Sequence, residues 1–336
     1  MTATIKRISS RLSIATKKAI FSGTALVLMF IVFSILKPTV FLEKSNLINI
    51  TQQVVTYSII GFGLTFCLVC GGTDLSAGAS MGLGGIIVVY LLSKQVSIPM
   101  AITLALIFGI LMGILNGFSI EVLGVVPFIA TLGTQWVFRG LAYVLVAGAP
   151  IYVNSVGNKQ IEDAFYQLGG GRFADTVPLL GSVPYSVVIT FVYGFILLFI
   201  ITKTKIGRQI YACGSNHAAA RLSGIDVITT RMFAYCVSGL SAVICGILVA
   251  SRASSAQPTA GIGYELEAIA ASVVGGVSIN GGEGTILNTI IGALIMGVLR
   301  NGLNLNGVSS FWQMVIIGVI VVAACAMEAQ RRKKNG

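Results

Sequence analysis

The stretch that decides the fold is VVTYSIIGFGLTFCLVC, residues 54–70, which contains no charged side chain. In lipid, the backbone polar groups of such a segment must be paired within the segment, and a helix pairs them all. Stretches that are likewise nearly free of charge occupy 20–36, 79–92, 100–115, 185–201, 232–250, 286–299 and 314–327. The sequence therefore predicts an all-α, polytopic transmembrane helix bundle.

Composition and charge agree with a membrane protein. Hydrophobic residues make up 55% of the 336 residues and charged residues only 10%, whereas about 25% charged residues is average. We therefore expect a single transmembrane domain over 1–336. The net charge of +11 would also suit nucleic acid, but most Lys and Arg residues gather at Lys6–Lys18, 203–231 and Arg331–Lys334. This positive-inside pattern predicts a bacterial inner-membrane protein with both termini cytoplasmic and no nucleic-acid partner.

With these clusters as cytoplasmic anchors, the chain is expected to cross the membrane about ten times. The predicted spans are 20–36, 47–70, a third ending near 93, a fourth from Pro99 to about Gly117, 126–147, 184–202, 231–251, 264–280, 284–304 and 310–327. The segment 148–183 is expected to be periplasmic, and 203–230 cytoplasmic. Glycines near 71–76 and 276–284 leave open a broken or re-entrant helix at each place. Val69–Gly78 also echoes Val273–Gly282, which suggests a duplicated transporter fold.

Asp74 is the most unusual residue between the predicted spans. A carboxylate at this depth is costly, so it is expected either at a functional site or at a turn near the interface. In the run Thr73, Asp74, Leu75, Ser76, the carboxylate can cap the next helix, whose first amides need acceptors. A direct transport role is the alternative, and the two roles are compatible if the helix start faces the pathway.

Polar stripes on other predicted spans suggest a route through the bundle. Thr131, Gln135 and Arg139 are spaced to share one helical face, with Thr134 beside them. Arg139 either faces a polar interior or extends outward to the headgroups. Further candidates for the pathway are Asn49, Gln52, Gln53, Thr56, Asn301, Asn304 and Gln313. Together they predict a passage for a neutral, hydrogen-bonding solute, because no ring of acidic side chains suggests an ion channel.

The basic loop 203–230 contains an alanine-rich helical turn that Asn216 can cap and Gly224 can end. A short cytoplasmic helix suits a contact with a soluble partner, whereas an ordinary basic loop is the plainer interpretation. The chain has no G-x-x-x-x-G-K-[ST] motif and only one histidine, so we expect no catalytic residue, metal site or cofactor. Cys67 and Cys70 form a C-x-x-C motif, which we interpret as packing because it lies in an apolar helix.

Four motifs resemble one family of transporters. Gly71–Gly78 is similar to the GG-x-DLS-x-G signature of monosaccharide ABC importer permeases, and Val126–Thr134 with Arg139-Gly140 resembles their P-F-I-x-T-L-G…R-G segment. The run from Gly207 to Ile225 resembles their cytoplasmic coupling loop, and Gly263–Thr285 completes the pattern. Details at Thr73, Gly276–Ser278 and Phe311–Gln313 look closest to galactose/methyl-galactoside permeases, with ribose permeases next.

The resemblance implies a BtuC-like type II importer fold that works as a homodimer or sometimes a heterodimer. It also implies a cytoplasmic ABC ATPase that drives transport and a periplasmic sugar-binding protein that delivers the solute. The implied ATPase-coupling residues are Gly207, Arg208, Ala219, Ala220, Arg221 and Gly224. His217-Ala218 departs from the family, whose loops often carry an acidic residue there. A permease for a nucleoside or a branched-chain amino acid, or an ion-coupled secondary transporter, stays open as an alternative.

Overall fold

The structure is a computed structural model that describes residues 14–174 and 181–335. Its elements are α2 (Ile14–Leu36), α3 (Pro38–Phe41), α4 (Lys44–Val69), α5 (Ala77–Ser93), α6 (Ile98–Glu121), α7 (Pro127–Leu145), β1 (Ile151–Tyr152), the 3₁₀ turn η1 (Val153–Val156), α8 (Lys159–Gly169), α9 (Tyr185–Lys203), α10 (Lys205–Ser215), α11 (His217–Leu222), α12 (Val227–Ala253), β2 (Ser255–Ala256), α13 (Tyr264–Gly275), α14 (Ile286–Leu305) and α15 (Ser310–Asn335). The predicted all-α architecture is confirmed. The basic residues Lys6–Arg11 and positions 175–180 of the predicted periplasmic segment lie outside the described residues.

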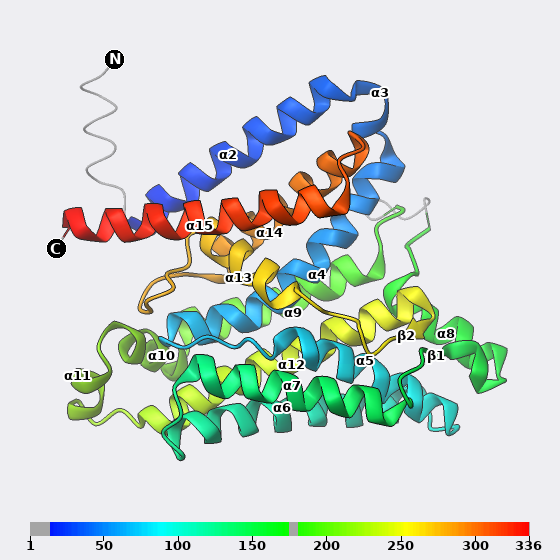
Figure 1. Cartoon of the computed structure of the whole chain (residues 1–336), viewed down its shortest axis with the longest axis horizontal. Helices are drawn as coiled ribbons and strands as arrows, with labels where there is room; N and C mark the ends of the chain where they lie inside the picture. The colour runs from blue at the N-terminus through cyan, green and yellow to red at the C-terminus, as the bar shows by residue number, and fades with distance from the viewer. Residues whose placement is uncertain (1–13, 175–180, 336) are drawn as a thin grey trace.

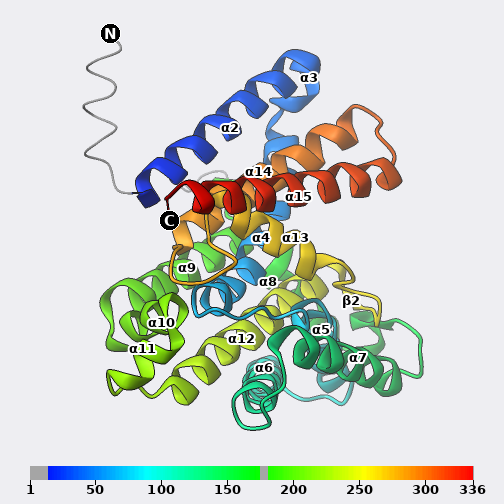
Figure 2. The same cartoon turned by 60° about the vertical axis from the view of Figure 1, so that its left-hand side comes forward.

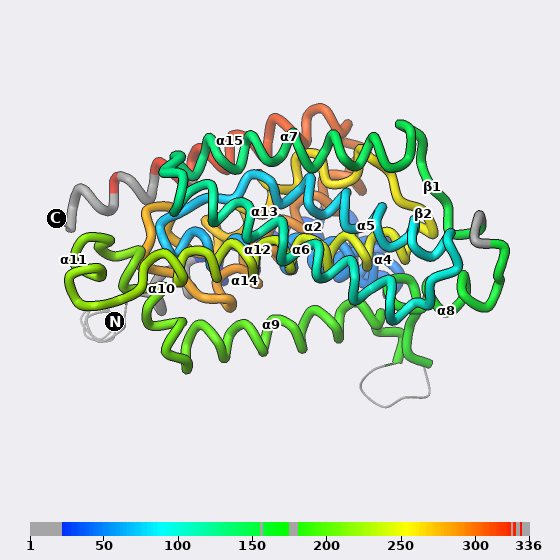
Figure 3. The backbone as a smooth tube through the Cα atoms, turned by 90° about the horizontal axis from the view of Figure 1, so that it is seen from below, coloured from blue at the N-terminus to red at the C-terminus, as the bar shows by residue number. Residues whose placement is uncertain are grey.

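The long helices run between two ends of the molecule (Figure 1). Helices α10 and α11 lie at one end, together with the start of α2 and the end of α15. Helices α3 and α8 and strands β1 and β2 lie at the opposite end, and Figure 3 shows α11 and α8 at opposite ends in the view from below. The loop 203–230, the start of α2 and the end of α15 are therefore at one end of the bundle.

Among the described residues, five helices are long and apolar enough to cross a membrane, namely α4, α6, α9, α12 and α14. Shorter apolar helices lie at Ser22–Leu36, Ala77–Ser93 and Ser310–Ala323. The structure does not form the predicted span 264–280 as one helix, because α13 has only 12 residues. At about 1.5 Å per residue it covers about 18 Å, well short of the hydrocarbon thickness of about 30 Å. The glycine-rich region after it is thus a break in the bundle.

The order helix, break, short helix and two further helices occurs twice. The first succession is α4, residues 70–76, α5, α6 and α7, and the second is α12, residues 254–263, α13, α14 and α15. Helix α12 packs on α5 and α6, whereas α4 packs on α13 and α14. Figure 2 shows α5, α6 and α7 on one side of the molecule and α14 and α15 on the other, with α4 between them. The counterpart of the break at 70–76 is therefore 254–263, and the sequence echo at Val273–Gly282 does not mark it.

Glycines bring the helix backbones into close contact. A Cβ at Gly239 of α12 would overlap the carbonyl oxygen of Gly109 in α6. A Cβ at Gly292 of α14 would likewise overlap the carbonyl oxygen of Ala271 in α13. Lipid tails are as apolar as leucine, so membrane helices associate through such close packing rather than through hydrophobic burial.

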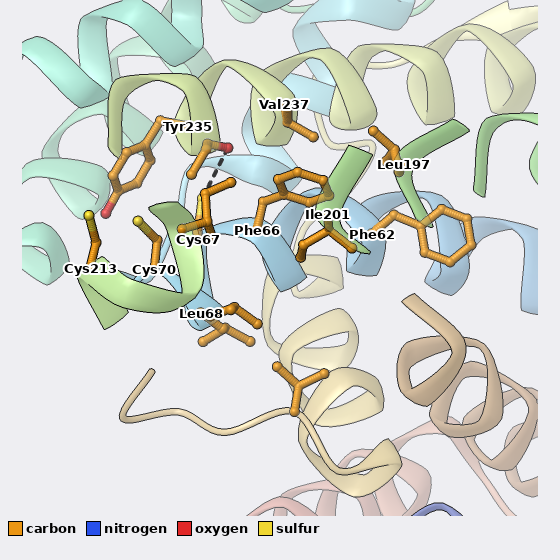
Figure 4. Close-up of a cluster of buried hydrophobic side chains, with 14 of the residues drawn as sticks. Phe62, Phe66, Cys67, Leu68, Cys70, Leu197, Ile201, Cys213, Tyr235 and Val237 are labelled. Carbon is orange, nitrogen blue, oxygen red and sulfur yellow. Dashed lines mark hydrogen bonds between the residues drawn. The ribbon is translucent and has the colours of Figure 1, made fainter. Parts of the chain in front are cut away.

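The Cys67-x-x-Cys70 motif lies in an apolar cluster between α4, α9, α10 and α12 (Figure 4). Both cysteines are buried, and neither forms a disulfide. The Cys67 thiol donates a hydrogen bond to the Ala234 carbonyl at 3.5 Å, and Cys70 lies beside Cys213 of α10. The motif therefore packs helices together, as the sequence interpretation expects.

Two segments meet at the end of the molecule opposite α11. Strand β1 pairs antiparallel with β2, with Ile151 opposite Ala256 and Tyr152 opposite Ser255. Helix α8 packs on α12, where the Gly169 amide donates to the Ser251 hydroxyl at 2.8 Å. The pairing attaches the predicted periplasmic segment 148–183 to the start of the second break, residues 254–263.

Candidate functional site

The first break carries Asp74 into the interior of the bundle, where the residue is 1% exposed. Its Oδ1 accepts hydrogen bonds from the Ser76 amide at 2.9 Å and the Ser76 hydroxyl at 2.6 Å. Its Oδ2 accepts from the Ser238 hydroxyl of α12 at 2.6 Å. The carboxylate therefore orders the turn that leads into α5 and ties this turn to α12. The N-cap residue of α5 is Ser76, without a side-chain cap bond, so Asp74 supports the turn and does not cap the helix itself.

The network continues into α6 and α7. The Asn116 amide of α6 donates to the Ser76 hydroxyl at 2.8 Å, and its oxygen accepts from the Thr134 hydroxyl at 2.5 Å. The Thr131 hydroxyl donates to the Pro127 carbonyl of its own helix at 2.9 Å and lies 3.4 Å from the Thr73 carbonyl. One polar network thus joins the break to three helices. The sequence interpretation missed the roles of Asn116 and Ser238, although a polar residue within an apolar helix is itself a signal.

The second break is held by Arg139, which is 8% exposed. Its Nη1 donates to the carbonyl oxygens of Pro258 and Ala260 at 2.5 Å each. Beside it, Gln135 Nε2 donates to Glu265 Oε1 at 3.4 Å, in the first turn of α13. Arg139 therefore faces the interior and not the outer headgroups, and it anchors residues 254–263 to α7.

Replacing Arg139 with methionine is expected to lower both solute uptake and the unfolding temperature of the detergent-solubilised chain. The change removes two hydrogen bonds from a charged donor, which contribute about 1.5–3 kcal/mol each. The matched control Gln135→Met removes one long bond from the same helix face, so its effect should be clearly smaller. Thermal unfolding followed by gel filtration measures the difference, and equal losses in the two variants would contradict the anchoring role.

Other predicted polar residues line a cavity of about 390 Å³ between α4, the end of α12 and α14. Its walls are Asn46, Asn49, Gln52, Gln53, Arg252, Asn301, Asn304 and Leu305. Asn46 and Asn301 exchange two amide hydrogen bonds, at 2.8 and 3.1 Å, which fix α4 against α14. The structure thus brings together Asn49, Gln52 and Asn301, which are distant in sequence.

Besides the residues at the two breaks, Thr56 and Gln313 are predicted pathway residues that lie outside the lining of this cavity. Thr56 is buried on α4, and its hydroxyl lies 3.5 Å from the Gln52 carbonyl. Gln313 is also buried, and its Nε2 donates to Asn304 Oδ1 at 3.3 Å and to the Val308 carbonyl at 2.8 Å. Gln313 therefore orients a residue of the cavity wall from α15.

A charged cluster that the sequence interpretation did not select lies on the same helices. Arg300 Nη1 donates to the Tyr57 hydroxyl at 2.8 Å and to Glu267 Oε2 at 2.7 Å. The Tyr57 ring also stacks on Tyr264, with ring centroids 6.1 Å apart. Arg300 could have been selected from the sequence, because burying an arginine in lipid costs free energy, so an arginine in an otherwise apolar segment indicates a functional or paired position.

Helices α10 and α11 occupy the predicted coupling loop. Gly207 is buried in the first turn of α10, where a Cβ would overlap the Ile201 carbonyl, whereas Arg208 is exposed. Asn216 caps α11, since its Oδ1 accepts from the Ala219 amide at 3.0 Å. Gly224 has a φ of +79°, a left-handed conformation that ends the helix. The predicted short helix is confirmed, and the alternative of an ordinary loop is not.

The face that α11 presents is apolar at its tip. Ala220 packs against the bundle, whereas Ala219 and Arg221 are exposed and Leu222 is 90% exposed. At the base of this projection, α10 contacts both α4 and the loop after α13. The Gly282 amide donates to the Val69 carbonyl at 2.8 Å, and the Tyr211 hydroxyl donates to the Gly284 carbonyl at 2.5 Å. A displacement of α10 would therefore act directly on the end of α4 near Val69.

Comparisons with known proteins identify the family. A family model described as "Branched-chain amino acid transport system / permease component" matches residues 46–325. The ribose import permease protein RbsC of Bacillus subtilis is 44% identical over 311 residues, which are 92% of this chain and 91% of that protein. RbsC of Escherichia coli K12 is 39% identical, with 92% of each chain covered. The D-allose transport system permease protein AlsC of the same strain is 35% identical, covering 91% of this chain and 90% of AlsC.

No solved structure matches the chain. The family match covers most of the sequence, including both breaks, the cavity and the helices α10 and α11. The relatives are transport subunits and not enzymes. The chain therefore belongs to the monosaccharide ABC importer permease family, within the wider family of branched-chain amino acid transport system permease components.

Proposed function

We propose that this chain is the permease subunit through which an ABC importer moves ribose into the cytoplasm. The observation that carries the proposal is the 44% identity to a ribose import permease over 92% of the chain. Other relatives are permeases of D-allose and L-arabinose transport systems, which supports a monosaccharide as the solute of this chain. Galactose or methyl-galactoside, which the residues around Thr73 suggest, is the alternative sugar.

The chain is a multi-pass protein of the inner membrane, and a permease of this class works with an ATPase and a substrate-binding protein. We place the ATPase contact at α10 and α11, which makes this end and both termini cytoplasmic. Support comes from the exposed Leu222 at the tip of α11, because an exposed apolar residue on a soluble projection suits a protein interface. The ATPase would press on α11 and move α10, which touches α4.

The binding protein would dock at the opposite end, on α8 and the segment after α12. Asp163 on α8 and Arg172 are exposed there, so charged groups of both signs are available for steering. A second copy of the chain would complete the permease as a homodimer. Charge reversal at Asp163 would be expected to weaken stimulation by the loaded binding protein.

Uptake of labelled solutes in the native host tests the proposal. Deletion of this chain is expected to abolish uptake of labelled D-ribose, and a plasmid copy should restore it. Unlabelled D-allose, L-arabinose, D-galactose and L-leucine are the competitors, the last because the family model is described for branched-chain amino acids. Unchanged ribose uptake together with loss of leucine uptake would overturn the proposal in favour of an amino-acid permease.

A further inference from the structure

We infer that the cavity between α4, the end of α12 and α14 is a binding site that receives one uncharged, polyhydroxylated ring molecule from the outer side. The inference rests on the proposed function and adds the place and the chemistry of recognition. The cavity measures about 390 Å³, near the lower end of the range of roughly 300–1,000 Å³ typical of small-molecule sites. This size suits a single sugar ring.

The lining is almost entirely made of amide side chains. Each amide offers both a donor and an acceptor, as does each sugar hydroxyl, so a ring bearing several hydroxyls is matched on all sides. Asn46 and Asn301 already bond to each other and form a rigid wall. Gln53 differs, because its buried Oε1 has no hydrogen-bond partner in the described part of the chain. A buried acceptor without a partner is costly, and a solute hydroxyl would satisfy it.

The charge of the lining argues against other solutes. Among the eight described lining residues Arg252 is the only charged one, and Leu305 is the only apolar one. A zwitterionic amino acid would need an anionic partner for its ammonium group and an apolar wall for its side chain, and the lining supplies neither. A cation would meet only Arg252 and neutral amides. The cavity is therefore built for a neutral polar molecule.

A hydrogen-bonded charged contact lies on the inner side of the cavity. Tyr57 lies one helical turn deeper than Gln53 on α4, and Arg300 lies one turn deeper than Asn304 on α14. These two deeper residues are hydrogen-bonded at 2.8 Å, and Glu267 binds the same guanidinium. Asn49 and Arg252, in contrast, are exposed, so the cavity opens toward the end that carries α8. A solute can thus enter from that end and wait above the Arg300–Tyr57 contact.

The test compares uptake by three full-length variants expressed in the deletion strain. Gln53→Leu removes the unpartnered acceptor and is expected to lower labelled ribose uptake by about tenfold, the change that corresponds to about 1.4 kcal/mol. Thr51→Val is the matched control, because Thr51 lies on the same helix turn, is half-buried and does not line the cavity. It should retain wild-type uptake. Equal amounts of purified chain eluting as one peak in detergent show that all variants fold.

The third variant tests the charge of the solute. Arg252→Gln keeps a hydrogen-bonding side chain but removes the cation, so a neutral ring should still be carried with less than about a tenfold loss. A greater loss would overturn the inference, since the cavity would then bind an anion. Wild-type uptake in Gln53→Leu would also overturn it while leaving the sugar permease intact. If the wild-type chain carries no sugar at all, the proposed function itself fails.

Discussion

Replacement of Gly224 by proline is expected to abolish solute uptake while the chain still inserts in the membrane. Gly224 adopts a φ of +79°, whereas the proline ring holds φ near about −65°. The Gly224 amide also donates to the Arg221 carbonyl at 3.1 Å, and proline has no amide hydrogen to donate. The end of α11 would therefore be rebuilt, and Leu222 would no longer be presented at the ATPase contact that we propose. Uptake of labelled ribose, normalised to the amount of chain in the membrane, measures the effect.

Two further variants separate the backbone from the surface at this site. No atom lies within 4 Å of a Cβ placed at Gly224, so Gly224→Asn meets no steric barrier, and asparagine tolerates the left-handed region. It should retain most of the uptake. Leu222→Asp keeps the backbone but places a charge on the residue that is 90% exposed, and it should uncouple transport as severely as proline does. Normal uptake in both Gly224→Pro and Leu222→Asp would remove α11 from the coupling mechanism.

Replacement of Asp74 by alanine is expected to have a similarly large effect, but through loss of folding. The carboxylate accepts hydrogen bonds from the Ser76 amide, the Ser76 hydroxyl and the Ser238 hydroxyl, all buried. Each buried donor left without an acceptor costs about 1–3 kcal/mol. The break would lose its attachment to α12, so a reduced yield of monodisperse chain in detergent is expected together with loss of uptake.

The variant Asp74→Asn separates the hydrogen-bonding role of Asp74 from its charge. The asparagine oxygen can still accept from the Ser76 amide and hydroxyl, and its amide group would replace Oδ2 opposite the Ser238 hydroxyl, which can rotate to accept. The yield of folded chain should therefore be close to that of the wild type, with uptake reduced only modestly. Severe loss of uptake at a normal yield would instead show that the charge of Asp74 takes part in transport.

Much of the fold was predictable from local sequence. The membrane helices follow from uncharged runs such as 54–70, because the requirement to pair backbone groups in lipid acts within one segment. The helix α11 was predictable for the same kind of reason, since the Asn216 cap and the Gly224 stop are contacts within one turn. The end of α13 at Gly275 agrees with the broken helix that the glycines near 276–284 left open, because Gly276 adopts a left-handed φ of +111°.

Part of the candidate site was likewise predictable from local sequence, and part was not. The stripe of Asn49, Gln52 and Gln53 on α4 could be recognised from helical spacing, but its partners on α12 and α14 could not. Arg252, at the end of α12, completes the cavity wall. Arg139 and Thr134 belong to one predicted polar stripe, yet Arg139 holds the second break, whereas Thr134 binds Asn116, which contacts Ser76 at the first break.

By itself, the sequence determined that this chain is a helical membrane protein, that its helices break at glycines, and that a short capped helix projects between α9 and α12. These properties depend on the solvent around each segment and on bonds between near neighbours in the chain. Only the tertiary structure decided which polar residues share a cavity and which form hydrogen bonds that hold the helices together. Those outcomes depend on contacts across the bundle, such as Asn46 with Asn301, which are 255 positions apart and leave no mark in local spacing.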